Sequence, residues 1–276
     1  MGEKNRIQQI LQSFSRSENQ INQPFACDSE QIKVGNQLMG ISIDDFSPDE
    51  DRFSMENPER LGANLVAATI SDLWASGVIP HFFLHAVCLS PAEDETFVSE
   101  FMRGANTALE DIGAFLIGGD LASGPGFRYT GVALGPLASR TQPLNRQLTG
   151  GEHDLWITGT LGDLNVAALQ KSVMPEIEIR KAEAEIIRTF GSACIDTSGG
   201  FFDSLMAMSD LNSDLCFSVQ VEAIPIEKSV VEFCTEAGLP LGAALLGGAG
   251  EYELLFTAPK ENREEIKDAS QTMPLT

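Results

Sequence analysis

The 276-residue sequence lacks the features that direct a chain to a membrane or to nucleic acid. It has no apolar run near the ~20 residues that span a bilayer, and the polar stretch 1–23 offers no signal-peptide core. Bases are scarce, since 18 Lys and Arg stand against 40 Asp and Glu, and the net charge of −22 repels DNA, RNA and anionic lipid. We therefore expect a cytoplasmic protein with neither a nucleic-acid nor a membrane partner.

Cysteine and histidine are also too few for a zinc site. The five cysteines include no C-x-x-C pair, which is typical of reduced, structural thiols in a cytoplasmic protein. Of the three histidines, His81 and His85 are four residues apart, a spacing that would suit a metal on a helix. Their segment, I-P-H-F-F-L-H-A-V-C-L, has the pattern of a strand instead. We therefore expect no zinc.

Strands alternate with helices in both halves of the sequence, which predicts a mixed α/β protein. The clearest strand patterns cover 37–46 and 80–89, and the clearest helices cover about 59–76 and 93–112. The turn-rich segment R-T-Q-P-L-N-R-Q-L-T-G-G-E-H is the best boundary, so we predict domains over 1–140 and 141–276. Further predicted elements include a short strand at 114–117, a charged helix at about 177–190, a strand at 215–221 and a helix near Val230.

Several aspartates come directly after an apolar strand or a tight turn. They are Asp28 after F-A-C, Asp44 in I-S-I-D, Asp120 in L-I-G-G-D and Asp196 in A-C-I-D. Mg²⁺ prefers such hard oxygen ligands, and neighbouring glycines allow the close backbone approach that a phosphate chain needs. Each aspartate alone is more often a turn former. The repetition is what favours a magnesium and phosphate site.

Asp72 is the most informative of the acids. In the helix predicted at 59–76, Leu65, Ala68 and Thr69 precede it by seven, four and three residues and share its face. Asp72 should therefore point inward, where an unpaired carboxylate costs several kcal/mol or more. No Lys or Arg occurs between Leu61 and His85, so a basic partner would have to come from elsewhere in the chain. Satisfaction by backbone donors remains the alternative to a metal.

The glycine-rich segments are weaker signals. G-G-D-L-A-S-G-P and G-G-A-G-E-Y-E-L both lack the G-K-[ST] ending of a Walker sequence, so each is more often a tight turn than a phosphate cradle. T-G-T-L-G-D, from Thr158 to Asp163, is equally compatible with an ordinary strand-to-helix turn and with a phosphate or substrate contact.

Taken in order, five motifs resemble the thiamine-monophosphate kinase family. They are I-S-D-L-W-A-S-G, L-I-G-G-D-L-A-S-G-P, I-T-G-T-L-G-D, I-D-T-S-G-G and L-L-G-G-A-G-E-Y-E-L-L-F. That family belongs to a wider group with aminoimidazole ribonucleotide synthetase and selenide,water dikinase. The resemblance spans roughly Asp28 to Pro259 and is more specific for the group than for one activity.

The resemblance implies a two-domain α/β fold of the aminoimidazole ribonucleotide synthetase type. Its N-terminal domain would form a barrel across a homodimer, with ATP between subunits and domains. The implied reaction transfers the γ-phosphoryl group of ATP to thiamine phosphate, giving thiamine diphosphate and ADP, with Mg²⁺ neutralising charge. The implied metal ligands are Asp28, Asp44, Asp72 and Asp120. The implied nucleotide contacts are Gly118, Gly119, Asp120, Thr158, Gly159 and Arg180, and the implied catalytic residues are Asp163 and Asp196.

The sequence departs from the family pattern at the metal and substrate ends of the site. Ser29 replaces an acid of the family's G-D-D segment, and Gly199 replaces a metal-binding aspartate, for which Asp203 is a candidate substitute. The G-G-A-G-E-Y-E-L motif is one residue longer than usual, and Arg180 is the clearest survivor of an arginine-proline-rich loop. The chain stops at Thr276, about where the family would begin another strand, which leaves a truncated C-terminal domain open. Two alternatives therefore stand beside the kinase: another ATP-using enzyme of the group, and a degenerate homologue that binds nucleotide without turnover.

Overall fold

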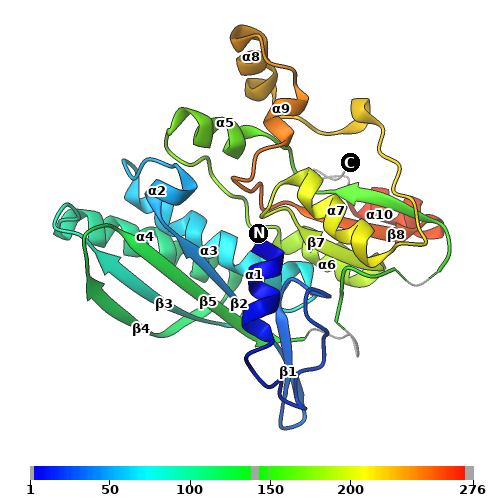
Figure 1. Cartoon of the computed structure of the whole chain (residues 1–276), viewed down its shortest axis with the longest axis horizontal. Helices are drawn as coiled ribbons and strands as arrows, with labels where there is room; N and C mark the ends of the chain where they lie inside the picture. Colours follow the sequence, from blue (N-terminus) through cyan, green and yellow to red (C-terminus); the bar gives the residue numbers. More distant parts are fainter. Residues whose placement is uncertain (1–2, 138–142, 149, 271–276) are drawn as a thin grey trace.

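A computed structural model describes residues 3–137, 143–148 and 150–270 of the chain. The described residues form two β-sheets with helices packed around them (Figure 1). The larger sheet has five strands in the order β1-β2-β5-β3-β4, antiparallel except for the parallel pair β3–β4. Its strands are β1 (Glu30–Val34), β2 (Gln37–Phe46), β3 (Phe82–Leu89), β4 (Phe115–Ser123) and β5 (Arg128–Pro136).

Two 18-residue helices, α3 (Pro58–Ala75) and α4 (Glu95–Ile112), cover one face of this sheet (Figure 1). Each begins at a residue whose side chain accepts a backbone N–H, Asn57 for α3 and Asp94 for α4. Glycines let the two helix backbones touch, because a Cβ on Gly62 would lie 2.0 Å from the Phe101 carbonyl oxygen. Thirteen residues of α3 are buried, so this helix lies at the centre of the molecule.

The smaller sheet has three strands in the order β6-β8-β7, all antiparallel neighbours. It comprises β6 (His153–Ile157), β7 (Ala193–Asp196) and β8 (Leu254–Pro259). Its helices are α5 (Asp163–Gln170), α6 (Lys181–Phe190), α7 (Phe201–Leu211), α8 (Lys228–Ala237), α9 (Gly242–Leu245) and α10 (Arg263–Ala269). The remaining elements are α1 (Glu3–Leu11), α2 (Pro48–Asp51) and the 3₁₀ turns Val221–Ala223 and Lys260–Asn262.

One apolar core joins the two sheets. Buried side chains of α3 and α4 form a continuous cluster with Trp156 of β6, Ile187 of α6 and Phe256 of β8. A second cluster lies between the smaller sheet and α7, around Ile195 and Met208. Helix α3 contacts both β2 and β7, so the ends of strands from both sheets meet beside it.

The mixed α/β class is confirmed, as are the strand at 37–46 and the long helices. The strand predicted over 215–221 is wrong, because 215–220 has an alternating pattern but no ladder partner and 221–223 is a 3₁₀ turn. The strand predicted over 114–117 extends to Ser123, and the charged helix starts only at Lys181. The boundary at 140/141 falls outside the described residues. Within the described part, no helix is long and apolar enough to cross a membrane.

Candidate metal and active site

Three aspartates from distant parts of the sequence converge beside α3. Asp28 precedes β1, Asp72 lies in the last turns of α3 and Asp196 ends β7; one carboxylate oxygen of each lies within 4.8 Å of the others. Asp196 is fixed by Ser71, whose hydroxyl donates to Asp196 Oδ2 at 2.5 Å, and by Ser198, whose hydroxyl donates to Oδ1 at 2.7 Å. We call Asp28, Asp72 and Asp196 the acid cluster.

The acid cluster carries more negative charge than its surroundings offset. Burial, and then the charge of Asp196, raise the pKa of Asp72 well above its usual range, and Asp28 and Asp44 add to the effect. Burial likewise raises the pKa of Asp28 to about 7, although Arg146 opposes the shift. Asp28 Oδ2 is buried and has no hydrogen-bond partner among the described residues. Converging carboxylates with an unsatisfied oxygen are the surroundings that a hard divalent cation fits.

Asp44 lies near the acid cluster on β2. Its position in the sheet is opposite Gly131 of β5, on the face that carries the buried Ser42 and Phe46 and packs against α3. Burial raises the pKa of Asp44 to about 6, and the charge of Asp196 contributes to that shift. Asp44 is therefore part of the same negative field as the acid cluster.

Arg146 is the base that faces the acid cluster, and sequence reasoning missed it. Its Nη2 atom lies 2.5 Å from Asp28 Oδ1, and both side chains are largely buried. The segment around it is held by backbone hydrogen bonds, from Arg146 N to Ala26 O and from Cys194 N to Asn145 O. Arg146 lies outside the Leu61–His85 stretch, and its charge lowers the pKa of Asp72 against the larger effect of burial. An arginine in a turn-rich connection gave no sequence signal of its own.

Arg180, predicted to contact the nucleotide, is instead buried in an ion pair. Its guanidinium donates to both carboxylate oxygens of Glu253, at 2.7 Å from Nε and 2.5 Å from Nη2, and also pairs with Glu178 and Glu183. Thr158 donates its hydroxyl to Glu253 as well, and it is fully buried. Arg180 and Thr158 therefore help to hold the smaller sheet together through Glu253. Their predicted nucleotide contacts stay predictions.

Gly159 makes room for that ion pair. A Cβ at this position would lie 2.0 Å from Glu253 Oε1 and 2.2 Å from Arg180 Nη2. Its φ of +58° is also in the left-handed region that favours glycine. The glycine has a packing reason here that is independent of any phosphate.

Glu253 in turn ties this ion pair to the acid cluster. The Glu253 backbone N–H donates to Thr197 Oγ1 at 2.9 Å, and the Thr197 N–H donates to the Glu253 carbonyl at 2.8 Å. Thr197 directly follows Asp196 in the sequence. The buried Arg180–Glu253 pair thus supports the end of β7, where Asp196 enters the acid cluster.

Asp163 begins α5 and lies outside the acid cluster. Burial raises its pKa, and its closest acidic neighbours are Glu227 and Glu251. The structure brings it to the motif G-G-A-G-E rather than to Asp72. Its predicted catalytic role stays a prediction.

Gly118, Gly119 and Asp120 lie within strand β4 rather than in a loop. Asp120 is opposite Ala86 of β3, and β3 and β5 separate β4 from β2. At about 4.8 Å per strand, β4 and β2 are roughly 14 Å apart, so within one chain Asp120 does not join the acid cluster. Gly119 is required by packing, since a Cβ there would lie 2.6 Å from the His85 ring. The metal role of Asp120 and the nucleotide roles of the two glycines stay predictions.

The position of the missing acid, Gly199, is not filled by Asp203. A Cβ at Gly199 would lie 3.6 Å from Asp203 Cβ, but the Asp203 side chain is exposed and is not among the acids that converge on Asp72. Tyr252 is a further residue that the sequence did not single out. It has a strained φ of +55°, and burial and then the charges of Asp44 and Asp196 raise the pKa of its hydroxyl well above the usual range.

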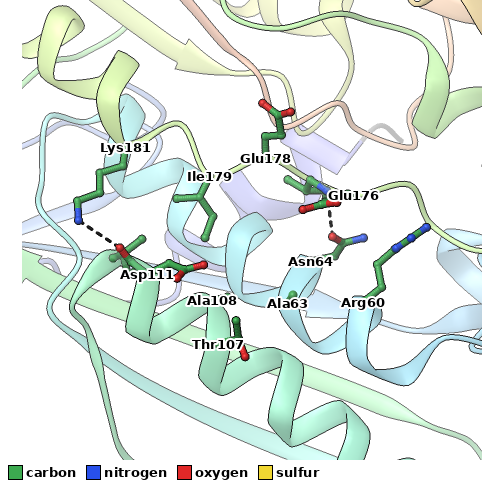
Figure 2. Close-up of a pocket in the computed structure, with 12 residues that line it drawn as sticks. Arg60, Ala63, Asn64, Thr107, Ala108, Asp111, Glu176, Glu178, Ile179 and Lys181 are labelled. Carbon is green, nitrogen blue, oxygen red and sulfur yellow. Dashed lines mark hydrogen bonds between the residues drawn. The ribbon is translucent and has the colours of Figure 1, made fainter. Parts of the chain in front are cut away.

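A cavity of about 640 Å³ lies between α3, α4 and the segment 176–181 (Figure 2). Two hydrogen bonds connect the helices to the segment 176–181. Asn64 of α3 accepts the Ile177 N–H at 2.9 Å, and Lys181 Nζ donates to the Asp111 carbonyl of α4 at 3.2 Å. None of its lining residues belongs to the acid cluster, and none is a predicted site residue. The candidate site therefore rests on converging side chains and not on this cavity.

Known proteins resemble this chain in both sequence and fold. The family described as AIR synthase related protein, N-terminal domain, matches residues 31–137, which include β1 to β5 apart from Glu30. Over these residues the chain is similar to that domain family. Curated relatives are named thiamine-monophosphate kinase, which confirms the resemblance seen in the motifs. The protein from Methanopyrus kandleri is 29% identical over 220 residues, 75% of this chain and 69% of its own length. The protein from Buchnera aphidicola subsp. Schizaphis graminum is 27% identical over 260 residues, 88% and 78% of the two chains.

Solved structures share the fold over almost the whole chain. One is AaThiL complexed with AMPPCP and TMP, with a TM-score of 0.81 and 19% identity, covering 100% of this chain and 89% of that one. Another is tt0281 from Thermus thermophilus, with a TM-score of 0.78 and 25% identity, covering 99% and 91%. The hydrogenase maturation protein HypE from E. coli also matches, with a TM-score of 0.73 and 16% identity, covering 99% and 88%. The chain therefore shares the mixed α/β fold of these structures.

Proposed function

We propose that this protein transfers the γ-phosphoryl group of ATP to the phosphate of thiamine phosphate, giving thiamine diphosphate and ADP. The observation that carries the proposal is the acid cluster, built from residues that the motifs singled out. The names of the curated relatives support the reaction, and a structure of the same fold was solved with AMPPCP, an ATP analogue, and TMP. The proposed co-substrate is ATP and the proposed phosphate acceptor is thiamine phosphate.

Magnesium fits the donor set of the acid cluster. Asp28, Asp72 and Asp196 would hold it, with Asp44 adjacent, because these oxygens are hard ligands whose mutual repulsion a divalent cation relieves. When bound, the metal supplies positive charge that neutralises the polyphosphate of ATP. Asp196, predicted from the family to be catalytic, is thus proposed here as a metal ligand.

The chain's own residues would bind and orient the reactants. Arg146 is a cation at the edge of an otherwise negative site, so it would attract phosphate oxygens that the carboxylates repel. Ser71 and Ser198 fix the Asp196 carboxylate by hydrogen bonds, and the next residue, Thr197, is held by its N–H bond to the Glu253 carbonyl. This preorganisation is the contribution expected of the protein in phosphoryl transfer, where positioning and charge stabilisation carry most of the catalysis.

We also propose a homodimer formed through the larger sheet. The described residues form an open sheet, and its end strand β4 has one free edge. Four large apolar residues of β4 are between 48% and 67% exposed: Phe115, Leu116, Ile117 and Leu121. A long, apolar, uncovered edge strand is a liability unless another chain covers it. Pairing with a second copy would extend this sheet towards the barrel that the family resemblance implies.

A cytoplasmic location is supported by the cysteines. All five are free, including the buried Cys27, Cys194 and Cys234. Unpaired thiols are typical of a reducing compartment, where the proposed co-substrate ATP is also present.

The activity is tested by incubating the purified protein with ATP, MgCl₂ and thiamine phosphate and separating the products by anion-exchange chromatography. Equal amounts of ADP and thiamine diphosphate are expected. ADP formed without thiamine diphosphate would point to a different acceptor. Nucleotide binding with no product from thiamine phosphate or other candidate acceptors would instead favour a degenerate homologue, the alternative that Gly199 raises.

A further inference from the structure

Glu251, in the altered G-G-A-G-E-Y-E-L motif, is a buried acid with one unsatisfied oxygen. The residue is 3% exposed. Its Oε1 atom accepts a hydrogen bond from Asn165 Nδ2 at 2.7 Å, whereas Oε2 is buried and has no partner among the described groups. A buried carboxylate oxygen left unpaired is costly, so something must occupy the position beside Oε2.

The group beside Glu251 is the carboxyl group of Asp163. The two side chains are within hydrogen-bonding reach of each other, and each perturbs the ionisation of the other. Asp163 Oδ1 already accepts the backbone N–H of Leu164 at 2.8 Å. Glu227, another acid, also faces the pair, and it accepts the hydroxyl of Thr160 at 2.9 Å. Two ionised carboxylates in contact repel, and Glu227 adds to that repulsion.

We propose that Glu251 keeps its proton at neutral pH and donates it from Oε2 to the ionised Asp163, which makes Glu251 a positioning residue for Asp163. One shared proton satisfies the unpartnered oxygen and removes one of the two charges. The sharing pattern is that of any two carboxyl groups forced together, which cannot both ionise. The electrostatics agree, because burial, and then the charge of Asp163, raise the pKa of Glu251 to about 8.

The shared proton would connect the start of α5 and the glycine-rich segment 247–251 to the acid cluster. Asn165 Oδ1 accepts the Ala249 N–H at 3.1 Å. A Cβ on Gly247 would lie 2.0 Å from that same oxygen, so the segment 247–251 packs directly on α5. The Glu251 N–H donates to the Thr197 carbonyl at 2.9 Å, one residue after Asp196. Glu251 therefore links Asp163, at the start of α5, to the strand end that carries Asp196. Its protonation does not depend on the proposed kinase activity, and the following test does not use that activity.

The test compares wild type with Glu251→Gln in urea unfolding at half-unit steps from pH 5.5 to 9.5. The pKa of Glu251 is raised from 4.5 when unfolded to about 8 when folded, so between these values the folded wild type holds one proton that the unfolded chain has released. The ratio of the unfolding equilibrium constants, wild type over variant, should rise tenfold per pH unit (about 1.4 kcal/mol) and become constant above pH 8. A ratio that is independent of pH from 5.5 to 8 would show that Glu251 is ionised and would overturn the proposal.

Glu251→Gln should fold, because its amide keeps the shape and can donate to Asp163 as the proton does; a variant that fails to fold would contradict the proposal. Asp163→Asn is the matched variant. It removes the negative acceptor. The ratio of unfolding equilibrium constants for Asp163→Asn over the double variant Asp163→Asn/Glu251→Gln should therefore become constant at a pH well below 8. If the ratio still became constant only at pH 8, burial alone would be sufficient to keep the proton on Glu251. Repeating the pH series with 10 mM MgCl₂ and with EDTA shows whether a proton or a metal ion lies between the two carboxylates. If the pH at which the ratio becomes constant moves lower with Mg²⁺, a metal ion binds there instead of the proton.

Discussion

Replacing Asp72 by Asn should stabilise the metal-free protein and, at the same time, remove its response to magnesium. The carboxylates of the acid cluster lie within 4.8 Å of one another. At that separation and an effective dielectric constant of 20, each pair of charges repels by about 3.5 kcal/mol. Arg146 offsets part of this, and protonation relieves more, so we expect Asp72→Asn to raise the free energy of unfolding by roughly 2 kcal/mol at pH 7 without metal. That corresponds to an increase in Tm of about 4–8 °C.

The effect should depend on pH in a defined direction. The pKa of Asp72 is raised in the folded state above its ordinary value of 3.8. Wild type therefore loses stability, relative to the Asn variant, as the pH rises above about 4. The advantage of Asp72→Asn should be nearly absent at pH 4 and should grow towards neutral pH. Measuring Tm by scanning calorimetry in EDTA at pH 4, 5, 6 and 7 checks both the sign and the window.

With magnesium, wild type should become more stable than Asp72→Asn. A ligand at one hundred times its Kd stabilises the folded state by about 2.7 kcal/mol, and a variant without one of the three cluster ligands should lose most of that gain. Asp203→Asn, on the exposed side of α7, is the matched control and should behave as wild type with and without Mg²⁺. If Asp72→Asn were destabilising in EDTA, or kept the full magnesium-dependent increase in Tm, Asp72 would be a structural residue and the acid cluster would not be a metal site.

Three further predictions concern the framework of the site. Arg180→Met should lower the free energy of unfolding by about 3–5 kcal/mol in urea denaturation, because it leaves Glu253 buried without its partner; a loss under 1 kcal/mol would mean that the ion pair is not needed. Gly104→Ala should cost about 3 kcal/mol, because its Cβ would lie 1.7 Å from a carbonyl oxygen of α3 and force the helices apart; unchanged stability would contradict the close helix packing. Phe115→Lys should convert the proposed dimer to monomer in sedimentation equilibrium, whereas Met206→Lys, an equally exposed control on α7, should not; a dimer that persists in both would place the interface elsewhere.

The parts of the fold that the sequence predicted are those governed by local rules. The two long helices have side-chain caps at Asn57 and Asp94, and α4 ends at Gly113 with a φ of +76°. The inward direction of Asp72 followed from helical periodicity. These inferences needed only residues close together in the sequence.

The predictions that failed, or that the structure did not bring together, depended on distant pairing. The 215–221 segment alternates like a strand, but alternation cannot show whether a partner strand is present. Asp120 has the same strand-end pattern as Asp44, yet sheet order puts it on the edge strand, and no local signal encodes that order. Arg180 was a candidate nucleotide contact because it is the clearest survivor of the family's arginine-proline-rich loop. The acid that it pairs with in the structure, Glu253, is 73 residues away in the sequence. Arg146 was missed for the same reason, since its role comes from Asp28, 118 residues away in the sequence.

A magnesium ion held by the acid cluster would make nucleotide binding depend on magnesium. Isothermal titration of the purified protein with AMPPCP, in 5 mM MgCl₂ and separately in EDTA, tests it most directly. We predict clear binding with MgCl₂, at least a tenfold weaker affinity in EDTA, and loss of that difference in Asp72→Asn. Equal affinity with and without magnesium, or no binding under either condition, would contradict the account.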